Sequence, residues 1–301
     1  MISLSTLGAV LSAQLGAQWT LEPAHASSFC ESWIARSQQR SLFVKTIAAS
    51  ESHVLTAEAD GLAALRKANA ICVPEVVDCW SAEGMTILAM EWLDFASADA
   101  SFGERFGRAL AQLHASPIEG EGAFGWHRDN MLGGTPQTNH WSAARGLEGW
   151  VEFLRLQRFG AMRSRLKTAQ VNAELLETID EVMESLPHFF RDGHEPRASL
   201  IHGDLWSGNW NMLRDGMPVI YDPAVSCSDA EAELAMMELF ASVPRGFWPA
   251  YQQIRPVAEG YAWRRDLYQL YHLMNHVVLF GASYVQRTLA CARTALAAIR
   301  R

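Results

Sequence analysis

The stretch "LIHGDLWSGNW" at residues 200–210 places a carboxylate and a carboxamide five positions apart, at Asp204 and Asn209. Phosphoryl transfer needs such groups, because a carboxylate must accept the proton of the attacking hydroxyl and oxygen atoms must hold magnesium on the phosphates. His202, taken alone, is more typical of a buried, hydrogen-bonded histidine than of a catalyst. The loop therefore predicts this chemistry only together with residues elsewhere in the chain.

A second carboxylate follows where another metal ligand is needed. The segment "NMLRDGMPVIYD" (211–222) has apolar runs on both sides of Asp215-Gly216, which is the pattern of a β-hairpin. Asp222 stands at the end of the second predicted strand. Protein kinases combine the same Asp and Asn spacing with a later metal-binding Asp. The pattern predicts Asp204 as a base and Asn209 and Asp222 as magnesium ligands.

Lys45 and Glu58 provide an independent test of the kinase interpretation. Lys45 lies in "SLFVKTI" (41–47), a predicted buried strand, and a lysine on an apolar face is costly unless it is paired or functional. Kinases direct such a lysine to the nucleotide phosphates and hold it with a helix glutamate. Glu58 follows 13 residues later, within a predicted helix over 52–68. The alternative is a lysine that extends to solvent and an exposed glutamate without function.

The segment "MEWLDF" (90–95) follows a third strand-like run and precedes the helical part of the chain. Met90, Glu91, Trp92 and Leu93 are therefore predicted to connect two lobes, at the place where backbone groups of a kinase meet adenine.

The order of the predicted elements indicates an α+β fold with two lobes. Residues 1–92 contain short strand-like runs and one clear helix, which predicts a small β-rich nucleotide-binding lobe. Residues 93–301 are mainly helical and end in two long predicted helices after Arg264. We expect this larger lobe to carry the catalytic loop and the acceptor site.

The apolar N-terminus predicts an amphipathic helix, because Leu4, Leu7, Leu11 and Leu15 fall on one helical face. A secretory signal is the alternative, but the first basic residue is Arg36 and the positive segment of a signal is missing. No segment of the sequence is long and apolar enough to span a bilayer.

The composition is that of a globular protein, with 301 residues, 49% hydrophobic, 19% charged and a net charge of −8. Runs of Lys or Arg are missing, which argues against nucleic acid and anionic membranes as partners. The five cysteines are scattered and form no CxxC pair. This pattern predicts reduced thiols in a cytoplasmic protein.

Together with the residues described above, the wider sequence resembles the fructosamine/ketosamine-3-kinases. These enzymes are relatives of the aminoglycoside phosphotransferases within the protein-kinase-like fold. The resemblance covers nearly the whole chain. Its specific part is "FG…DN…G.TPQ.N.W" joined to "HGDLWSGN", a combination that aminoglycoside and choline kinases are not expected to carry. Further matching stretches are "FVK", "EADGLAAL", "MEWL", "LAQLH", "YDPA" and "LYQLYHLMNHVVLFGASY".

The resemblance implies ATP- and magnesium-dependent phosphorylation of O3 of a ketose that is linked to an amine, an amino acid or a protein lysine. The 3-phosphate product is unstable and releases the sugar, so the outcome is deglycation. By position, Asp204 would be the general base, Asn209 and Asp222 the magnesium ligands, and Lys45 with Glu58 the phosphate clamp.

Four further side chains are predicted on the acceptor side. Trp206 lies beside the base and packs either on the sugar or between the lobes. Asp129 and Asn130 precede a Gly-Gly-Thr-Pro-Gln turn and either approach the acceptor or cap backbone groups, the second reading being favoured. Glu231 belongs to "SCSDAEAELAM" (226–236), which is expected to border the acceptor.

Two stretches depart from the family pattern. Ala26 and Ser27 stand in the predicted nucleotide-covering loop "HASSFCESW" (25–33), where the family usually has glycines, so a positive φ is more costly there. In "SCSDAEAELAM", Ala230 replaces an arginine and Glu233 an aspartate, which predicts a shifted choice of acceptor.

Two other functions stay open on the sequence alone. One is a kinase of another cationic small molecule, such as an aminoglycoside, and the other is a nucleotide-binding pseudokinase that acts as a scaffold. The complete set of predicted catalytic residues argues against the pseudokinase, and only the altered glycine loop supports it. The expected partner is a small-molecule or protein-bound ketosamine, and the oligomeric state stays open.

Overall fold

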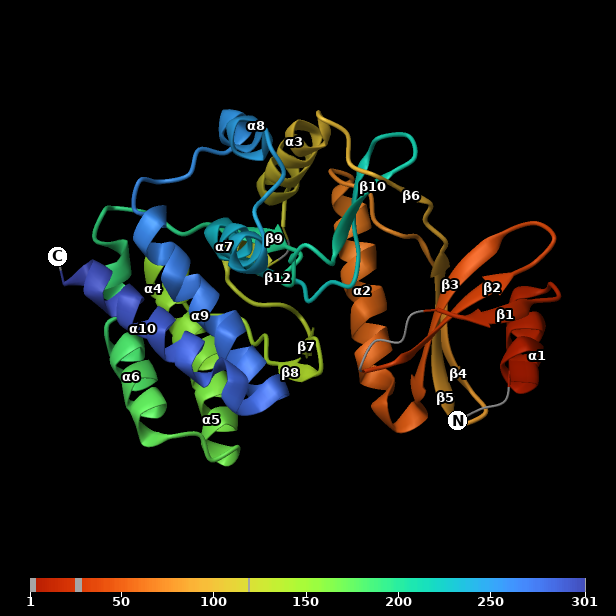
Figure 1. The fold of residues 1–301 in the computed structure, drawn as a ribbon, viewed down its shortest axis with the longest axis horizontal. Coiled ribbons are helices and arrows are strands. Elements are labelled where there is room, and N and C mark those ends of the chain that lie inside the picture. Colours follow the sequence, from red (N-terminus) through yellow and green to blue (C-terminus); the bar gives the residue numbers. More distant parts are fainter. Residues whose placement is uncertain (1–3, 25–28, 119, 301) are drawn as a thin grey trace.

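The computed structural model describes residues 4–24, 29–118 and 120–300 and consists of a sheet-rich part and a larger helical part (Figure 1). In the sheet-rich part, five antiparallel strands lie in the order β1-β2-β3-β5-β4. The elements are α1 (Leu4–Leu15), β1 (Thr20–Pro23), β2 (Glu31–Arg36), β3 (Ser41–Ala48), α2 (Ser52–Ala68), β4 (Val76–Ala82) and β5 (Met85–Glu91).

The two faces of this sheet are covered by different helices. Leu42 and Val44 of β3 pack with Leu7 and Leu11 of α1 in one core cluster. This confirms the predicted amphipathic N-terminal helix, although Leu4 is 47% exposed. The alternation of β3 sends Lys45 to the other face, where α2 lies (Figure 1).

Helix α2 has the bounds that the sequence predicts. Leu55, Leu62 and Leu65 are buried against the sheet, and Asn69 ends the helix in the left-handed conformation with a φ of 52°. Because these leucines fix the rotation of the helix, they also fix the direction in which Glu58 points.

The connection to the helical part runs through β6 (Phe95–Ala96), which joins the predicted hairpin. Strands β10 (Trp210–Leu213) and β11 (Pro218–Ile220) are antiparallel, and β6 is the third strand of their sheet. Gly216 has a φ of 88°, so the Asp215-Gly216 turn is confirmed. The Ile220 amide donates to Cys72 O at 3.0 Å, which ties the hairpin to the segment after α2.

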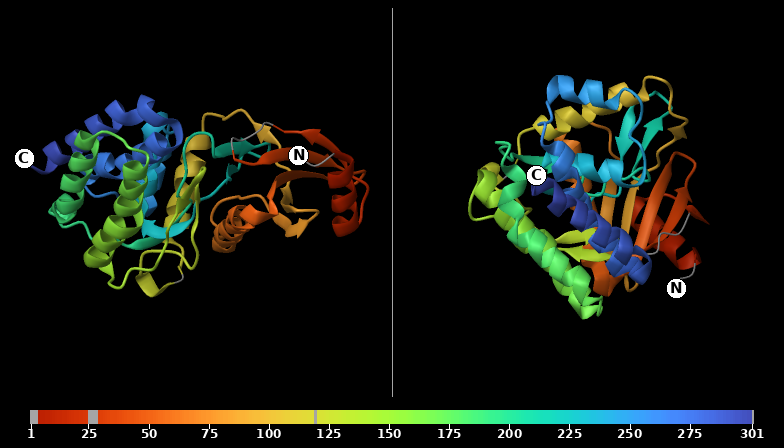
Figure 2. Two further views of the ribbon diagram at one scale, coloured as in Figure 1. Left: turned by 90° about the horizontal axis from the view of Figure 1, so that it is seen from below. Right: turned by 60° about the vertical axis from the view of Figure 1, so that its left-hand side comes forward.

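The larger part is built mainly from helices, and Figure 2 shows them gathered at the end of the molecule opposite the five-stranded sheet. The two predicted tail helices are confirmed as α9 and α10. No helix in the described part of the chain is long and apolar enough to cross a membrane. The elements are α3 (Phe102–Ala115), β7 (Asn130–Leu132), β8 (Thr135–Gln137), α4 (Gly146–Phe153), a π-helical segment η3 (Leu154–Gly160), α5 (Ala161–Thr168), α6 (Ala173–Glu184), β9 (Ala198–Ile201), β12 (Ser226–Asp229), α7 (Ala230–Phe240), α8 (Phe247–Ile254), α9 (Tyr261–Phe280) and α10 (Val285–Ile299).

This architecture confirms the predicted α+β fold, with a β-rich N-terminal part and a mainly helical C-terminal part. The expected division of the chain after residue 92 stays a prediction. Ala26 and Ser27 of the predicted nucleotide-covering loop lie outside the described residues.

Glycine allows α3 and α8 to approach each other closely. A Cβ atom added at Gly107 would lie 2.4 Å from the Phe247 carbonyl oxygen, a backbone atom that cannot move aside alone. We expect Gly107→Ala to lower the free energy of unfolding by about 2–3 kcal/mol, because the two helices must separate. Chemical denaturation of the purified variant measures this change.

Gly8→Ala is the matched control for this prediction. Gly8 lies within α1, and an added Cβ would make only an ordinary contact of 3.5 Å with Trp19 O. We expect this substitution to stabilise the protein by about 0.5–1 kcal/mol through helix propensity. Equal changes in the free energy of unfolding for the two substitutions would show that the close approach of α3 and α8 at Gly107 does not determine stability.

Candidate active site

One ammonium group joins three elements of the fold. Lys45 Nζ on β3 lies 2.6 Å from Glu58 Oε1 on α2 and 2.7 Å from Asp222 Oδ1 after β11. Burial would lower the pKa of Lys45, but the charges of Glu58 and Asp222 outweigh it and hold that pKa above its usual range. The lysine is therefore charged and fixed between both carboxylates.

Asp222 occupies a strained position that turns its carboxylate toward Lys45. Its φ is 59°, which is uncommon for a residue other than glycine, and it lies two residues beyond the end of β11. Its side chain is 48% exposed while that of Lys45 is 8% exposed. The Asp222 carboxylate can therefore contact both the lysine and a ligand from solvent.

Asp204 and Asn209 lie in the loop between β9 and β10. The Asn209 amide group donates from Nδ2 to Asp204 O at 2.8 Å, and its backbone N–H donates to Trp206 O at 2.9 Å. Burial, together with the charges of Asp222 and Glu233, raises the pKa of Asp204 to about 7. A carboxyl group with that pKa can both accept and release a proton near neutral pH.

Glu233 on α7 holds the backbone of this loop. Its carboxylate accepts hydrogen bonds from His202 N at 2.9 Å and Gly203 N at 2.7 Å. His114 on α3 contacts the same carboxylate through Nε2 at 3.1 Å and Tyr251 OH through Nδ1 at 2.8 Å. Burial favours protonation of Glu233, but these hydrogen bonds to the ionised form outweigh it and keep the pKa of Glu233 low.

His202 has a positioning role that its contacts define. Burial lowers its pKa, so the imidazole is neutral. Its Nδ1 accepts from Asp204 N at 3.3 Å, and Nε2 therefore carries the hydrogen that is donated to Tyr221 O at 2.8 Å. His202 thus ties the loop of Asp204 to the residue before Asp222.

Gly203 is required between these two residues. Its φ is 84°, and an added Cβ would lie 2.1 Å from Ala224 O. The segments 202–204 and 222–224 can therefore pass close to each other only because residue 203 lacks a side chain.

Residues 90–93 form the connection that the sequence predicts between the sheet and the helical part. Met90 is buried and pairs with Phe43, whereas Glu91 accepts a hydrogen bond from Glu75 N at 3.2 Å. The Trp92 indole donates to Asp94 Oδ1 at 3.1 Å. Leu93 follows on the way to β6. Contact of these residues with adenine stays a prediction.

The predicted acceptor residues differ in their surroundings. Trp206 is 41% exposed, and its indole lies over Gly208, where an added Cβ would be 2.3 Å from the ring. Asp129 accepts from Asn139 N at 2.9 Å, while Asn130 is buried and donates to Val225 O at 2.8 Å. Asp129 and Asn130 therefore organise backbone around the β7–β8 hairpin, as the capping interpretation predicts.

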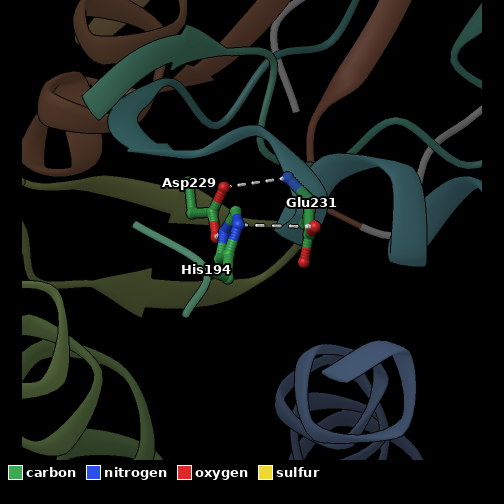
Figure 3. A group of neighbouring side chains, drawn as sticks. All are labelled: His194, Asp229 and Glu231. Carbon is green, nitrogen blue, oxygen red and sulfur yellow. Dashed lines mark hydrogen bonds and ion pairs between the residues drawn. The ribbon is translucent and has the colours of Figure 1, made fainter. Parts of the chain in front are cut away.

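Glu231 belongs to a separate polar cluster with His194 and Asp229 (Figure 3). His194 Nε2 lies 2.8 Å from Asp229 Oδ2, and Arg264 Nε lies 2.7 Å from Glu231 Oε2. The three ligand atoms are close enough for a metal ion, but Arg264 and His194 already supply positive charge there. This cluster lines a cleft of about 990 Å³ whose walls do not include Asp204.

Comparison with known proteins decides the family. The model of the fructosamine kinase family matches residues 4–298. The chain belongs to the fructosamine kinase family. A Synechocystis protein named "Probable ketoamine kinase" is 37% identical over 83% of this chain and 81% of that protein. A protein-ribulosamine 3-kinase, chloroplastic, of Oryza sativa subsp. indica is 34% identical over 81% of this chain and 69% of that protein.

Solved structures agree with the fructosamine kinase family. A Thermobifida fusca protein assigned as a fructosamine-3-kinase superposes with a TM-score of 0.84 at 30% identity and covers 98% of this chain and 100% of that chain. The aminoglycoside phosphotransferase APH(4)-Ia superposes with a TM-score of 0.66 at 13% identity over 99% of both chains. The second likeness shows that the fold is shared with kinase-like phosphotransferases.

Sequence reasoning missed two residues that hold the active site of this family member. In the sequence, Glu233 stands out only as a departure from the family pattern, and His114 only as the last residue of the matching stretch "LAQLH". A spacing rule cannot pair them, because 119 positions separate them in the chain. The available signal was a glutamate and a histidine inside otherwise apolar helix faces, where charged groups need partners.

The role of Glu233 predicts that Glu233→Gln destabilises the protein. The amide keeps the shape of the side chain but lacks the charge and one of the two acceptor oxygens, so His202 N or Gly203 N loses its partner. We expect a loss of about 2–3 kcal/mol in the free energy of unfolding. Thermal and chemical denaturation at pH 7 measure it.

Glu238→Gln on the same helix is the control. Glu238 contacts Tyr261 OH at 2.9 Å and lies 3.8 Å from Arg265, outside the catalytic loop. We expect a loss below about 1 kcal/mol there. A Glu233→Gln protein as stable as the Glu238→Gln protein would contradict the role of Glu233.

Proposed function

We propose that the protein is an ATP-dependent kinase that phosphorylates the 3-hydroxyl of ketosamines, such as fructosamine or ribulosamine adducts on amines or protein lysines. Loss of the sugar from the product then leads to deglycation. The observation that carries the proposal is the Lys45 ammonium held at 2.6 Å from Glu58 and 2.7 Å from Asp222. Membership of the fructosamine kinase family and the names of its relatives support the choice of acceptor.

In this proposal the Lys45–Glu58 pair binds the phosphates of ATP, and backbone groups of Met90, Glu91, Trp92 and Leu93 bind adenine. Lys45 is preorganised, because Glu58 fixes its ammonium before the nucleotide arrives. A charged donor that needs no rearrangement stabilises the developing charge of phosphoryl transfer.

Magnesium fits the oxygen atoms near Asp222. Hard divalent cations prefer carboxylate and amide oxygens, and Asp222 presents a half-exposed carboxylate. Asn209 uses its amide nitrogen on Asp204 O, which leaves its amide oxygen as the ligand atom. Asp222 and Asn209 would hold Mg²⁺, which supplies positive charge on the phosphates of the nucleotide.

Asp204 acts in this proposal as the general base on the 3-hydroxyl. Its pKa near 7 leaves it ionised in a large fraction of molecules at neutral pH. The exposed Trp206 indole lies two residues away and offers an apolar face for the sugar ring. The other three predicted acceptor residues do not contact the sugar in this proposal. They act indirectly, through the backbone and side chains that they order, and they are Asp129, Asn130 and Glu231.

The two alternative functions, an aminoglycoside-type kinase and a nucleotide-binding pseudokinase, have no specific observation in their favour. The likeness to aminoglycoside phosphotransferases rests on 13% identity, which shows the fold alone. A pseudokinase does not need the complete set of Lys45, Glu58, Asp204, Asn209 and Asp222. The proposal places the enzyme in the cytoplasm, where the reduced state expected for its scattered cysteines is maintained.

The decisive experiment measures ADP release with Mg²⁺-ATP and a panel of acceptors. The panel contains fructosyl-lysine, ribulosyl-lysine, the parent amines and an aminoglycoside set, and phosphorus NMR identifies the phosphorylated position. We expect turnover only with the ketosamines and a product that releases the sugar. Turnover with aminoglycosides alone would show that the acceptor is an aminoglycoside and not a ketosamine. Nucleotide binding without any turnover would favour the pseudokinase.

Asp204→Asn tests the general base. We expect kcat on a ketosamine to fall by roughly 10²–10⁴-fold, because the carboxamide cannot accept the proton. Binding of ATP, measured by calorimetry, should change little. An Asp204→Asn protein that keeps full kcat would rule out the carboxylate as the base.

The pKa of Asp204 also predicts a pH dependence of the reaction. The base must be ionised, so kcat/KM for the acceptor should fall as pH drops below the pKa of Asp204, which is about 7 in the free protein and lower where Mg²⁺ compensates the charge of Asp222. Rates measured from pH 4.5 to 8.5 at saturating Mg²⁺-ATP test this. A rate that rises as pH drops through that range would contradict a base at Asp204.

The raised pKa of Asp204 also predicts that Asp204→Asn stabilises the free protein at high pH. The folded pKa of Asp204 lies above its unfolded value, so ionisation weakens folding as pH rises from about 4 to 7. Above pH 7 the variant should be more stable by a few kcal/mol, at most about 4. Near pH 4 the difference should vanish, which thermal denaturation at both pH values measures.

A further inference from the structure

An aromatic ring joins the sheet-rich part of the molecule to the β7–β8 hairpin. The described chain resumes at Phe29, two residues before β2, in the segment predicted to cover the nucleotide. A Cβ atom added at Gly134 would lie 2.2 Å from Phe29 Cε1, and one added at Gly133 would lie 3.5 Å from Cε2. The ring therefore lies on the backbone of the turn between β7 and β8.

The Phe29 ring, and not the backbone conformation, requires glycine at position 134. Gly133 has a φ of 56°, in the left-handed region that favours glycine, whereas the φ of Gly134 lies outside that region. The three atoms nearest to a Cβ added at Gly134 all belong to the Phe29 ring. An alanine at position 134 could therefore be accommodated only if the ring moved away.

Phe29 leads into the strand that lies beside Lys45. Strand β2 pairs with β3 in a register that places Ser32 opposite Lys45. The Trp33 indole donates to Thr46 Oγ1 at 3.1 Å, which fixes the same pair of strands through side chains. Because the two strands are hydrogen-bonded in one sheet, the position of the Phe29 end of β2 is linked to that of the Lys45 ammonium.

The hairpin on the other side is fixed to the segment that follows Asp222. Asn130 Nδ2 donates to Val225 O at 2.8 Å, three residues beyond Asp222. Tyr271 OH on α9 donates to Gln137 Oε1 at 2.8 Å. Figure 1 shows β7 and β8 at the side of the helical part that faces α2. The hairpin therefore links the predicted metal-binding segment at its base to the aromatic ring at its tip.

This contact differs in kind from the Lys45–Asp222 ion pair, which also joins the two parts of the molecule. The ion pair uses two groups that the proposed function assigns to the phosphates and to magnesium. Nucleotide binding must therefore compete with the ion pair, whereas an apolar ring on a glycine turn uses no group that the nucleotide or the metal needs. The Phe29 side chain is 42% exposed, so its removal should leave the core intact.

We propose that Phe29 is a positioning residue that holds the strand beside Lys45 against the hairpin that is anchored beyond Asp222. In the proposed function, the phosphates are bound from the Lys45 side and the acceptor hydroxyl from the Asp204 side, so phosphoryl transfer requires a fixed separation of the two parts. The ring on the glycine turn maintains that separation when Asp222 turns from the lysine to magnesium. The kinetic consequences rest on the proposed function.

Hydrogen exchange tests the contact without any turnover. Amide exchange of a peptide that covers residues 130–137 is measured by mass spectrometry in the free protein. Phe29→Ala should raise exchange in this peptide several-fold, because the tip of the hairpin loses the ring that covers it. Ile254→Ala on α8 is the control, since Ile254 is similarly exposed (41%), and it should leave this exchange unchanged. Unchanged exchange in the Phe29→Ala protein would overturn the proposal.

A double-mutant cycle tests the positioning role. Phe29→Ala removes the ring and Gly134→Ala displaces it, so each variant should lower kcat on a ketosamine roughly tenfold. KM for ATP should change less than about threefold, because the Lys45–Glu58 pair is not altered. The double variant should be no slower than either single variant, since both changes remove one contact. Effects that multiply to roughly a hundredfold would overturn the proposal.

Phe29→Met is the conservative variant, because it keeps an apolar side chain of similar reach on the turn. It should restore most of kcat and the slow exchange of the hairpin. Ile254→Ala should leave kcat unchanged. A Phe29→Met protein as slow in turnover as the Phe29→Ala protein would overturn the apolar contact as the cause.

The two measurements distinguish this inference from the proposed function. Faster hairpin exchange on Phe29→Ala, in a protein that turns over no ketosamine, would support the contact and contradict the function. Ketosamine turnover that Phe29→Ala leaves unchanged would support the function and overturn the positioning role.

Discussion

The ammonium of Lys45 is the contact on which the arrangement of the active site depends. It receives one carboxylate from α2 and one from the segment after β11, so a single buried charge joins the sheet, its helix and the hairpin. Glu58 needs the lysine, because a buried ion without a partner costs several kcal/mol. The triad therefore fixes the position of α2 relative to the hairpin as well as the chemistry of the site.

Negative charge accumulates around Asp204, and this has opposite effects on stability and on reactivity. Asp222 and Glu233 add to burial and raise the pKa of Asp204 to about 7, so the folded protein resists its ionisation. The same shift gives the carboxyl group a proton affinity that suits a base at neutral pH. A magnesium ion beside Asp222 would compensate part of this charge, which fits a site that is complete only with its nucleotide.

Two different kinds of contact hold the site. Ion pairs fix Lys45 between the lobes, whereas neutral donors fix the catalytic loop on Glu233. Gly203 makes the second arrangement possible, because the chain at Ala224 passes where its side chain would be. The position of Asp204 thus depends on backbone hydrogen bonds that involve neither Lys45 nor Asp222.

The sequence by itself determined the features that depend on neighbours along the chain. The bounds of α2, the Asp215-Gly216 hairpin and the spacing of Asp204 and Asn209 follow from local periodicity and turn chemistry, and they needed no tertiary information. The pairing of Lys45 with Glu58 was also predicted, from the kinase pattern of a strand lysine and a helix glutamate, whereas the contact of Lys45 with Asp222 was not.

Only the tertiary structure decided which distant residues compensate one another. Glu233 meets His114 on another helix, although no periodicity relates the two positions. The structure likewise placed Asn130 in a backbone contact and Glu231 in an ion pair with Arg264. The physical reason is that charge compensation acts through space between separate elements, and the sequence records each charge without its partner.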